Sequence, residues 1–333
     1  MKDLCNYSLL AHNTFGINAR CARFLEYETA VEAQQVAEIL RESSLPYIII
    51  GGGSNLLLTR DFPGIVVHSA VKGWDIVGKR MACGSGEVWD DIVAVSLCNG
   101  LYGAENLSLI PGDVGASAVQ NIGAYGVEAK DFIREVHAVD ITTGHLCIID
   151  NADCNYGYRQ SRFKEEWKNR FLITRVVYEF SDTFQPRLDY GNIRGEMERQ
   201  GVSEPTPQQL RQIIIDIRNA KLPDPQVQGN AGSFFMNPVV SRAKYEKLAA
   251  QYPQMPHYTI DSENEKIPAG WMIEQCGWKG KALGRAGVHD KQALVLVNLG
   301  GATGQDVVDL CETIRRDVHD KFGIDIHPEV NII

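Results

Sequence analysis

Two glycine-rich segments constrain this chain more than any other feature of its sequence. The first, Gly51-Gly-Gly-Ser-Asn55, directly follows the apolar run Tyr47-Ile-Ile-Ile50. The second lies between Tyr102 and Ala129, where five glycines stand among small residues and no lysine or arginine occurs. Glycine lets the backbone approach a ligand closely, and consecutive amide groups can turn inward to form an anion nest. The two segments together predict a large cofactor whose phosphates are held by backbone amides and hydroxyls.

Neither segment carries a standard nucleotide motif by itself. The first is not a P-loop, because no Gly-Lys-Ser/Thr follows, and it is not G-x-G-x-x-G, because residue 56 is leucine. A tight hairpin turn is an equally good explanation of residues 51–55. Close packing of small residues in a core is the alternative for 102–129. The presence of both segments in one chain favours the cofactor.

Length and composition indicate a two-domain globular protein. The chain has 333 residues, of which 44% are hydrophobic and 23% charged. Its net charge of −9 argues against a nucleic-acid partner but permits a small basic pocket for an anionic metabolite. The apolar runs are too short to insert in a membrane, and the N-terminus has no secretory signal. The scattered cysteines predict reduced thiols, no metal site and a cytoplasmic protein.

Local signals predict several helices and an α+β fold. A capping box at Thr29 and Glu32 begins one helix, and Gly100 ends another that runs from about Trp89 to Cys98. A third helix begins at Thr206-Pro207 and runs to Arg218. The last begins at Thr303, with Asp306 as its capping partner and Gly323 at its end, and a strand is expected over 324–333. Residues 102–129 are expected to be rich in loops.

The Lys221-Leu-Pro-Asp-Pro225 stretch breaks the third helix and marks the main domain boundary. We therefore expect one domain over 1–218, with two lobes divided near residue 70. The second domain is expected over 219–333, with the C-terminal strand 324–333 returning to the active site.

An ordered series of motifs covers residues 13–330. They are Asn13-Thr-Phe-Gly16, Gly51-Gly-Gly-Ser-Asn55, Pro111-Gly-x-Val-Gly115, Gln120-Asn-Ile-Gly-Ala-Tyr-Gly126, Tyr156-Gly-Tyr-Arg-x-Ser161, Lys221-Leu-Pro-Asp-Pro225, Gly229-Asn-Ala-Gly-Ser-Phe-Phe235, Ala269-Gly-Trp271 and Pro328-Glu-Val330. In this series the chain resembles the UDP-N-acetylenolpyruvoylglucosamine reductases, also called UDP-N-acetylmuramate dehydrogenases, of peptidoglycan synthesis. The single fragments are weak signals, but the ordered set is very specific.

The resemblance implies an FAD-binding module of the vanillyl-alcohol-oxidase type and a C-terminal α+β substrate-binding domain. It further implies that NADPH reduces the flavin, and that flavin N5 passes hydride to the enolpyruvyl double bond of UDP-N-acetylglucosamine enolpyruvate. Three positions match the family's catalytic groups: Ser233 as proton donor, with Arg159 and Glu329 assisting the enolic carboxylate. Each has a plain structural alternative, namely a turn hydroxyl for Ser233, an ion pair for Arg159 and an exposed strand carboxylate for Glu329.

The same resemblance assigns binding residues. The cofactor set is Gly51, Gly52, Gly53, Ser54, Asn55, Pro111, Gly112, Gly115, Ser117, Gln120, Gly123 and Arg218. The substrate set is Tyr190, Lys221, Asn237, Tyr258 and Gln292. Tyr258 is included because the long segment between the serine motif and Ala269-Gly-Trp271 resembles type I members, in which a tyrosine covers the bound substrate. A surface tyrosine is the alternative for this residue, and a core aromatic is the alternative for Tyr190.

Two positions depart from the family pattern. Met236 stands where the family has lysine, so one cation near the substrate diphosphate is absent. Ala116 replaces a residue that often carries a hydroxyl near the flavin phosphates, and Ser117 is the candidate to substitute for it. Neither change removes a catalytic group.

Two rival functions stay open at this stage. One is an FAD dehydrogenase of the same fold with another substrate, and the other is a nucleotide-binding regulator without turnover. A regulator has no need of Arg159, Ser233 and Glu329 together, and an unrelated oxidase has no need of Lys221 and Asn237. We expect a monomer that acts on a small molecule.

Overall fold

The computed structural model describes residues 1–333 and divides into two compact units. The first unit consists of Met1–Tyr7, Cys21–Gly52 and Phe62–Asn219, and the second of Ser8–Arg20, Gly53–Asp61 and Ala220–Ile333. The sequence placed the boundary between residues 218 and 219, and the contacts divide the chain between Asn219 and Ala220. It did not foresee that 8–20 and 53–61 belong with the C-terminal unit.

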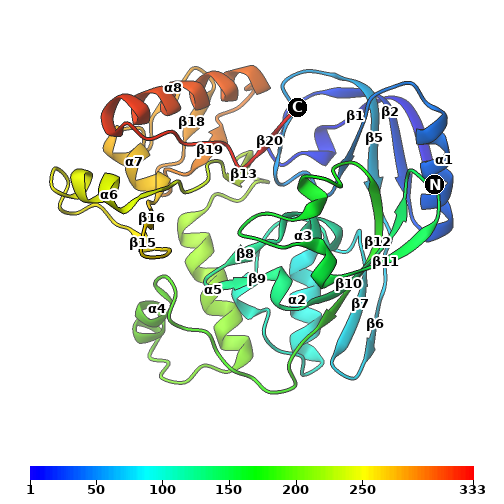
Figure 1. Cartoon of the computed structure of the whole chain (residues 1–333), viewed down its shortest axis with the longest axis horizontal. Helices are drawn as coiled ribbons and strands as arrows, with labels where there is room; N and C mark the ends of the chain where they lie inside the picture. Colours follow the sequence, from blue (N-terminus) through cyan, green and yellow to red (C-terminus); the bar gives the residue numbers. More distant parts are fainter. The chain divides into compact units, whose positions relative to one another are not determined.

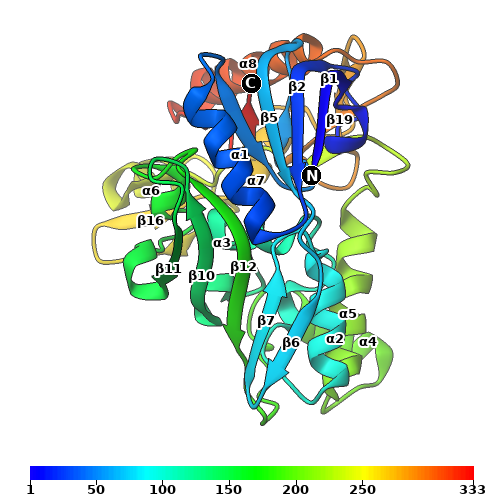
Figure 2. The same cartoon turned by 90° about the vertical axis from the view of Figure 1, so that its right-hand side faces the viewer.

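Two sheets build the first unit (Figure 1). One has the order β1-β2-β5-β3, formed by β1 (Lys2–Ser8), β2 (Arg20–Tyr27), β5 (Phe62–Ser69) and β3 (Tyr47–Ile50). The other has the order β11-β10-β12-β7-β6, formed by β11 (Leu146–Asp150), β10 (Ile133–Asp140), β12 (Phe171–Glu179), β7 (Arg80–Gly84) and β6 (Trp74–Val77). Strands β2, β5 and β3 run parallel, whereas the neighbours within the second sheet are antiparallel (Figure 2). The fold is therefore a mixture of parallel and antiparallel sheets with helices.

Helices cover these sheets through their apolar faces. Helix α1 (Ala30–Glu42) buries Val36 and Leu40 in a cluster that also contains Val139 of β10 and Leu172 of β12. The remaining helices of the unit are α2 (Trp89–Cys98), α3 (Val114–Gln120), α4 (Ile193–Gln200) and α5 (Pro207–Lys221). Two short strands, β8 (Gly123–Ala124) and β9 (Val127–Glu128), follow α3 and pair with each other. The segment 102–129 is thus less irregular than the sequence suggested, because it contains a helix and a hairpin.

The second unit carries three small sheets and three helices. One sheet has the order β13-β19-β18-β17, with β13 (Asn230–Ser233), β19 (Val295–Asn298), β18 (Ala286–Val288) and β17 (Ala282–Leu283). A second has the order β14-β16-β15, with β14 (Val239–Ser241), β16 (Asn264–Lys266) and β15 (Tyr258–Thr259). The third pairs β20 (Asn331–Ile332) in parallel with β4 (Leu56–Leu57). The helices are α6 (Arg242–Ala249), α7 (Ala269–Gln275) and α8 (Gly304–Phe322).

Helix α8 shows why local signals located some elements well. Thr303 and Asp306 form the reciprocal capping box, and Gly323 ends the helix with φ of 58°. The side chains of Val307, Ile314 and Val318 are buried along one face of the helix. The expected strand over 324–333 is wrong for most of its length, since only Asn331–Ile332 is a strand.

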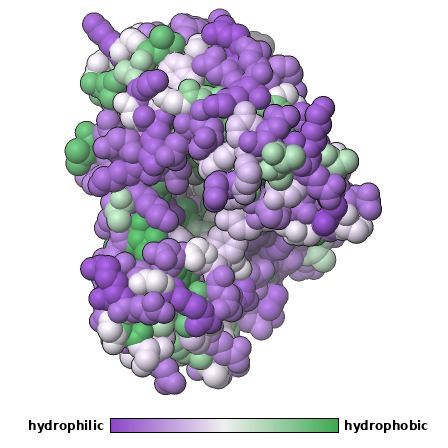
Figure 3. Space-filling view, turned by 90° about the vertical axis from the view of Figure 1, so that its left-hand side faces the viewer, coloured by the Kyte–Doolittle hydropathy of each residue, from purple (hydrophilic) through white to green (hydrophobic).

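Apolar residues are gathered inside each unit. The face drawn in Figure 3 is mostly hydrophilic, with apolar residues standing among polar ones. None of the helices combines the length and the apolar character that crossing a bilayer requires.

Candidate active site

The two glycine segments meet in the first unit. A Cβ atom at Gly51 would lie 3.0 Å from Cβ of Ala116, and one at Gly52 would lie 3.1 Å from Oδ1 of Asp113 and 3.4 Å from Cα of Gly112. A side chain at either glycine would therefore force its neighbours in the second segment to shift by a few tenths of an ångström. The glycine backbone at this surface suits the close approach of a cofactor such as FAD, and the surface carries the carboxylate of Asp113 but not the lysine of a P-loop.

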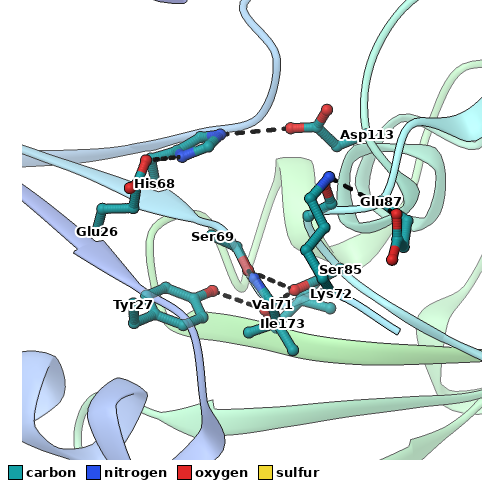
Figure 4. Close-up of polar contacts among 11 residues, drawn as sticks. Glu26, Tyr27, His68, Ser69, Val71, Lys72, Ser85, Glu87, Asp113 and Ile173 are labelled. Carbon is teal, nitrogen blue, oxygen red and sulfur yellow. Dashed lines mark hydrogen bonds and ion pairs between the residues drawn. The ribbon is translucent and has the colours of Figure 1, made fainter. Parts of the chain in front are cut away.

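A polar network fixes the strands beneath this surface (Figure 4). The hydroxyl of Tyr27 on β2 donates a hydrogen bond of 2.6 Å to the carbonyl of Ile173 on β12. The hydroxyl of Ser85 donates to the same carbonyl at 2.6 Å and shares a 2.6 Å hydrogen bond with Ser69 at the end of β5. Since the carbonyl of Ser85 accepts from the amide of Gly115, the network also reaches the second glycine segment.

His68 connects strand β2 with the second glycine segment. Its Nδ1 lies 2.9 Å from Oε2 of Glu26, and its Nε2 lies 3.5 Å from Oδ2 of Asp113 (Figure 4). Burial opposes the charged imidazole, but the hydrogen bonds and charges of Asp113 and Glu26 outweigh it and raise the pKa of His68. Sequence reasoning missed this group, because no motif spacing links the end of a strand to an aspartate within a glycine segment.

Ser117 is placed in the core. Its hydroxyl donates to the carbonyl of Val114 at 2.7 Å and shares a 2.7 Å hydrogen bond with the hydroxyl of Tyr178. The side chain is almost completely buried, at 1% exposure. These partners give the Ser117 hydroxyl a structural role, and its assignment to the cofactor site stays a prediction.

Arg159 lies against the turn that follows α3. Its Nη2 donates a hydrogen bond of 2.5 Å to the carbonyl of Gly123, and a Cβ at Gly123 would be 2.8 Å from its Nη1. The residue has a left-handed backbone, with φ of 56°, which is uncommon outside glycine and asparagine. Arg159, which is predicted to be catalytic, thereby contacts Gly123, which is predicted to bind the cofactor.

Arg218 adds a second cation to this region. It lies near the end of α5, and its buried Nε has no hydrogen-bond partner. Burial lowers the pKa of Arg218 and the charge of Arg159 lowers it further, while Tyr125 and Asp90 act in the opposite direction. A buried donor near a second guanidinium is a suitable place for an anionic or carbonyl-bearing group of a ligand.

Tyr190 packs beside the same turn. A Cβ at Gly126 would lie 3.4 Å from Cβ of Tyr190, and one at Gly191 would lie 3.3 Å from the ring of Tyr125. Asn106, which sequence reasoning missed, donates hydrogen bonds of 2.9 Å to the carbonyls of Tyr125 and Arg187. Its side chain thus holds the segment that carries Tyr190. Tyr190 is itself 44% exposed and so available to a ligand.

In the second unit, Ser233 and Glu329 lie on adjacent segments. The amide of Glu329 donates a 2.8 Å hydrogen bond to the carbonyl of Phe234, and the amide of Met236 donates a 2.9 Å bond to the carbonyl of His327. Phe234 and Phe235 are buried, but Ser233 is exposed. The two predicted catalytic residues of this unit are therefore neighbours in space.

Residues 53–55 of the first glycine segment belong to the second unit, where they contact the N-terminal motif Asn13-Thr-Phe-Gly16 and the C-terminal segment. Gly53 has φ of 69°, and a Cβ there would lie 2.0 Å from the carbonyl oxygen of His12, so only glycine fits. The amide of Thr14 donates to the carbonyl of Gly53 at 3.1 Å, and its hydroxyl donates to the carbonyl of Asn230 at 2.6 Å. The side chain of Asn55 donates to the carbonyl of Glu329 at 3.4 Å.

Asn237 and Gln292 both lie near the start of α7. Oδ1 of Asn237 accepts from the amide of Ala269 at 2.9 Å, and Oε1 of Gln292 would lie 3.2 Å from a Cβ at Gly270. Lys221, the last residue of α5, is exposed.

Tyr258, the first residue of β15, is 47% exposed. The Nζ atom of Lys266, opposite it on β16, lies 5.9 Å from the centroid of its ring. Sequence reasoning had not connected this cation with the tyrosine.

Comparison with known families matches two parts of the chain. Residues 22–150 match the FAD binding domain family, and residues 224–333 match the C-terminal domain of UDP-N-acetylenolpyruvoylglucosamine reductase. The glycine surface and the first of these matches define the class: the protein is an FAD-dependent oxidoreductase.

Full-length relatives identify the family. A UDP-N-acetylenolpyruvoylglucosamine reductase of Bacteroides fragilis is 54% identical, covering 98% of this chain and 99% of its own length. One of Flavobacterium johnsoniae is 42% identical and covers 100% of both. The chain belongs to the UDP-N-acetylenolpyruvoylglucosamine reductase family, as its motifs predicted.

A solved structure supports the fold. UDP-N-acetylenolpyruvylglucosamine reductase from Thermus caldophilus superposes with a TM-score of 0.68 at 22% identity, covering 99% of this chain and 98% of that one. The 6-hydroxy-D-nicotine oxidase of Arthrobacter nicotinovorans superposes with a TM-score of 0.56 at 13% identity, covering 97% and 86%. The expected combination of an FAD-binding module and a second α+β domain is confirmed.

Proposed function

We propose that this chain uses FAD and NADPH to reduce UDP-N-acetylglucosamine enolpyruvate to UDP-N-acetylmuramate, with Arg159, Ser233 and Glu329 as its catalytic residues. Family membership supports the reaction. The observation that carries the assignment of residues is the pairing of segment 233–236 with segment 327–329, which makes Ser233 and Glu329 neighbours. A regulator without turnover gives no reason for that placement.

The first unit is proposed to hold the cofactor. Gly51, Gly52, Gly112 and Gly115 supply close backbone approach, and Arg218 offers its buried Nε. Pro111, Ser117, Gln120 and Gly123 complete the part of the proposed FAD site that belongs to the first unit. Gly53, Ser54 and Asn55, which belong to the second unit, are the remaining residues proposed for the cofactor. When bound, the flavin supplies the hydride acceptor and donor that the reaction requires.

The protein's own groups are proposed to stabilise charge and deliver the proton. A guanidinium can grip a carboxylate with two hydrogen bonds, so Arg159 is suited to the enolpyruvyl carboxylate and to the negative charge that develops there. Ser233 donates a proton to the α-carbon, because a carbanionic neighbour is a strong enough base to deprotonate an alcohol. Glu329 assists at the same carboxylate in its enolic form.

Binding of the nucleotide is assigned to residues with accessible polar groups. Lys221 is suited to the diphosphate as a mobile point charge. Asn237 and Gln292 present amide groups near the start of α7, and Tyr190 and Tyr258 present exposed phenols. The same pocket is proposed to take NADPH and the enolpyruvyl nucleotide in turn. We also propose that the protein acts as a cytoplasmic monomer.

Anaerobic mixing tests the function. The yellow flavin band of the purified protein should bleach with NADPH and return when the enolpyruvyl nucleotide is added. A protein that never bleaches is a regulator, and one that bleaches but does not recover with this nucleotide is a dehydrogenase for another substrate.

A further inference from the structure

The carboxylate of Asp113 occupies a position that is unfavourable for binding a diphosphate. One of its oxygens would lie 3.1 Å from a Cβ at Gly52, and the other 3.5 Å from a Cβ at Gly51. Both glycines belong to the loop assigned to the flavin diphosphate. A carboxylate at this distance repels an anionic ligand unless a cation neutralises it, because charges interact strongly where water is largely excluded.

The side chain of Asp113, the N-cap residue of α3, does not cap that helix. An aspartate at this position normally accepts hydrogen bonds from the first turn of the helix. Here it makes no such capping bond, and its carboxylate is directed to Nε2 of His68 at 3.5 Å. The amides of Val114 and Gly115 instead donate to the carbonyls of Glu87 and Ser85.

His68 faces Asp113 and carries a positive charge when its imidazole is protonated. Glu26 of β2 contacts its other nitrogen at 2.9 Å, and Lys2 of β1 forms an ion pair with Glu26. The ring of Phe24 stacks on the imidazole of His68, with 6.3 Å between the ring centroids and an interplanar angle of 23°. The neighbouring strand β3 contributes Ile50 opposite His68. With His68 protonated, two cations balance two carboxylates in this cluster.

We propose that His68 is a positioning residue for FAD, which it serves by neutralising and orienting Asp113 beside the glycine loop. This inference rests on the proposed placement of the flavin diphosphate at residues 51–52 and 111–115. It implies that the protonated imidazole is the form that permits tight cofactor binding. Retention of FAD should therefore weaken as pH rises through the elevated pKa of His68, where the imidazole loses its charge.

Two substitutions separate this role from a merely structural one. H68Q keeps a polar side chain but removes the cation, and it should raise the dissociation constant for FAD about tenfold or more. Adding D113N to H68Q should restore most of the lost affinity for FAD, because the carboxylate that needed a neutralising charge is gone. H137Q is the matched control, because His137 pairs with Glu135 at 3.0 Å in the same unit but away from the glycine loop.

The measurement is flavin fluorescence on serial dilution of the full-length holoenzyme from about pH 6 to about pH 9. H137Q should match the unsubstituted protein throughout. The inference is overturned if H68Q retains FAD as well as the unsubstituted protein does, or if D113N gives no recovery. If H68Q does not fold, D113N alone decides. This variant should lose the pH dependence of FAD retention, and a pH dependence that persists in D113N contradicts the proposal. An unsubstituted protein that binds no FAD refutes the proposed function itself.

Discussion

The amide of Glu329 donates a hydrogen bond of 2.8 Å to the carbonyl of Phe234, the residue that follows Ser233. This bond joins the C-terminal segment to the end of strand β13 and sets the distance between a proposed proton donor and a proposed supporting carboxylate. Because Phe234 and Phe235 are anchored in the core, the backbone of Ser233 is held although its side chain is exposed. The geometry makes Ser233 the residue whose removal is most informative.

Substitution of Ser233 by alanine should separate the two half-reactions. Reduction of FAD by NADPH involves no enolate, so its rate should stay near normal. Protonation of the α-carbon loses its positioned acid, and flavin reoxidation by the enolpyruvyl nucleotide should slow by about 10²- to 10⁴-fold. Rapid-mixing absorbance at the flavin band measures both rates.

Ser241→Ala serves as a control for the loss of a hydroxyl. Ser241 caps α6 by accepting from the amide of Lys244, so its removal should cost about 1 kcal/mol of stability and leave both half-reactions unchanged. If Ser233→Ala slows reduction and reoxidation equally, Ser233 is structural.

The change Met236→Lys tests the missing cation. Met236 follows the buried Phe235 in the chain, and its amide donates a hydrogen bond to the carbonyl of His327. The backbone at this position is therefore fixed. Restoring the charge should lower KM for the nucleotide substrate while changing the rate of flavin reduction at saturating NADPH little. Steady-state kinetics with varied nucleotide provides the measurement. An unchanged KM would mean that another cation already fills this role.

Helix ends were predictable where the signal is local. The N-cap of α8 at Thr303 and the start of α5 at Pro207 were located from capping residues and proline alone. The extent of α2, Trp89–Cys98, was also predicted correctly. Helix α3 was missed because its sequence, Val-Gly-Ala-Ser-Ala-Val-Gln, has little helical periodicity and resembles a loop. What stabilises it is tertiary: Val114 and Ala118 are buried in the same cluster as Val176 and Tyr178 of β12.

Site residues with a motif could be named from the sequence, but their contacts could not. The motif around Thr14 was visible, whereas its hydrogen bond to Asn230 joins segments far apart in the chain and places 8–20 in the second unit. His68 had no motif at all, since its significance depends on Asp113 and Glu26 converging on it. Ser117 was chosen for its hydroxyl, and only the structure shows that Tyr178 and Val114 occupy it.

Gly52→Ala should weaken binding of FAD. The added Cβ would lie 3.1 Å from Oδ1 of Asp113 and 3.4 Å from Cα of Gly112, so the second glycine segment must shift to accept it. We expect the dissociation constant for FAD to rise about tenfold, which corresponds to about 1.4 kcal/mol. Gly157→Ala is the control, because its Cβ would meet only Cβ of Gln160, at 3.6 Å. Flavin fluorescence on dilution gives both constants, and equal values for the two variants contradict the assignment of Gly52.

Arg159→Ala should impair hydride addition itself. The guanidinium is held by the carbonyl of Gly123 at 2.5 Å, and it is the proposed partner of the carboxylate that gains negative charge. Its loss should slow flavin reoxidation by about 10²-fold or more, in the range found when one charge-stabilising donor is removed. Arg162→Ala is a matched control, because Arg162 lies nearby in the chain but pairs with Glu166 at 3.1 Å and the carbonyl of Asp153. Rapid mixing at several nucleotide concentrations separates binding from the hydride step. If Arg159→Ala raises only the concentration needed for half-maximal reoxidation, Arg159 binds the substrate without stabilising the developing charge.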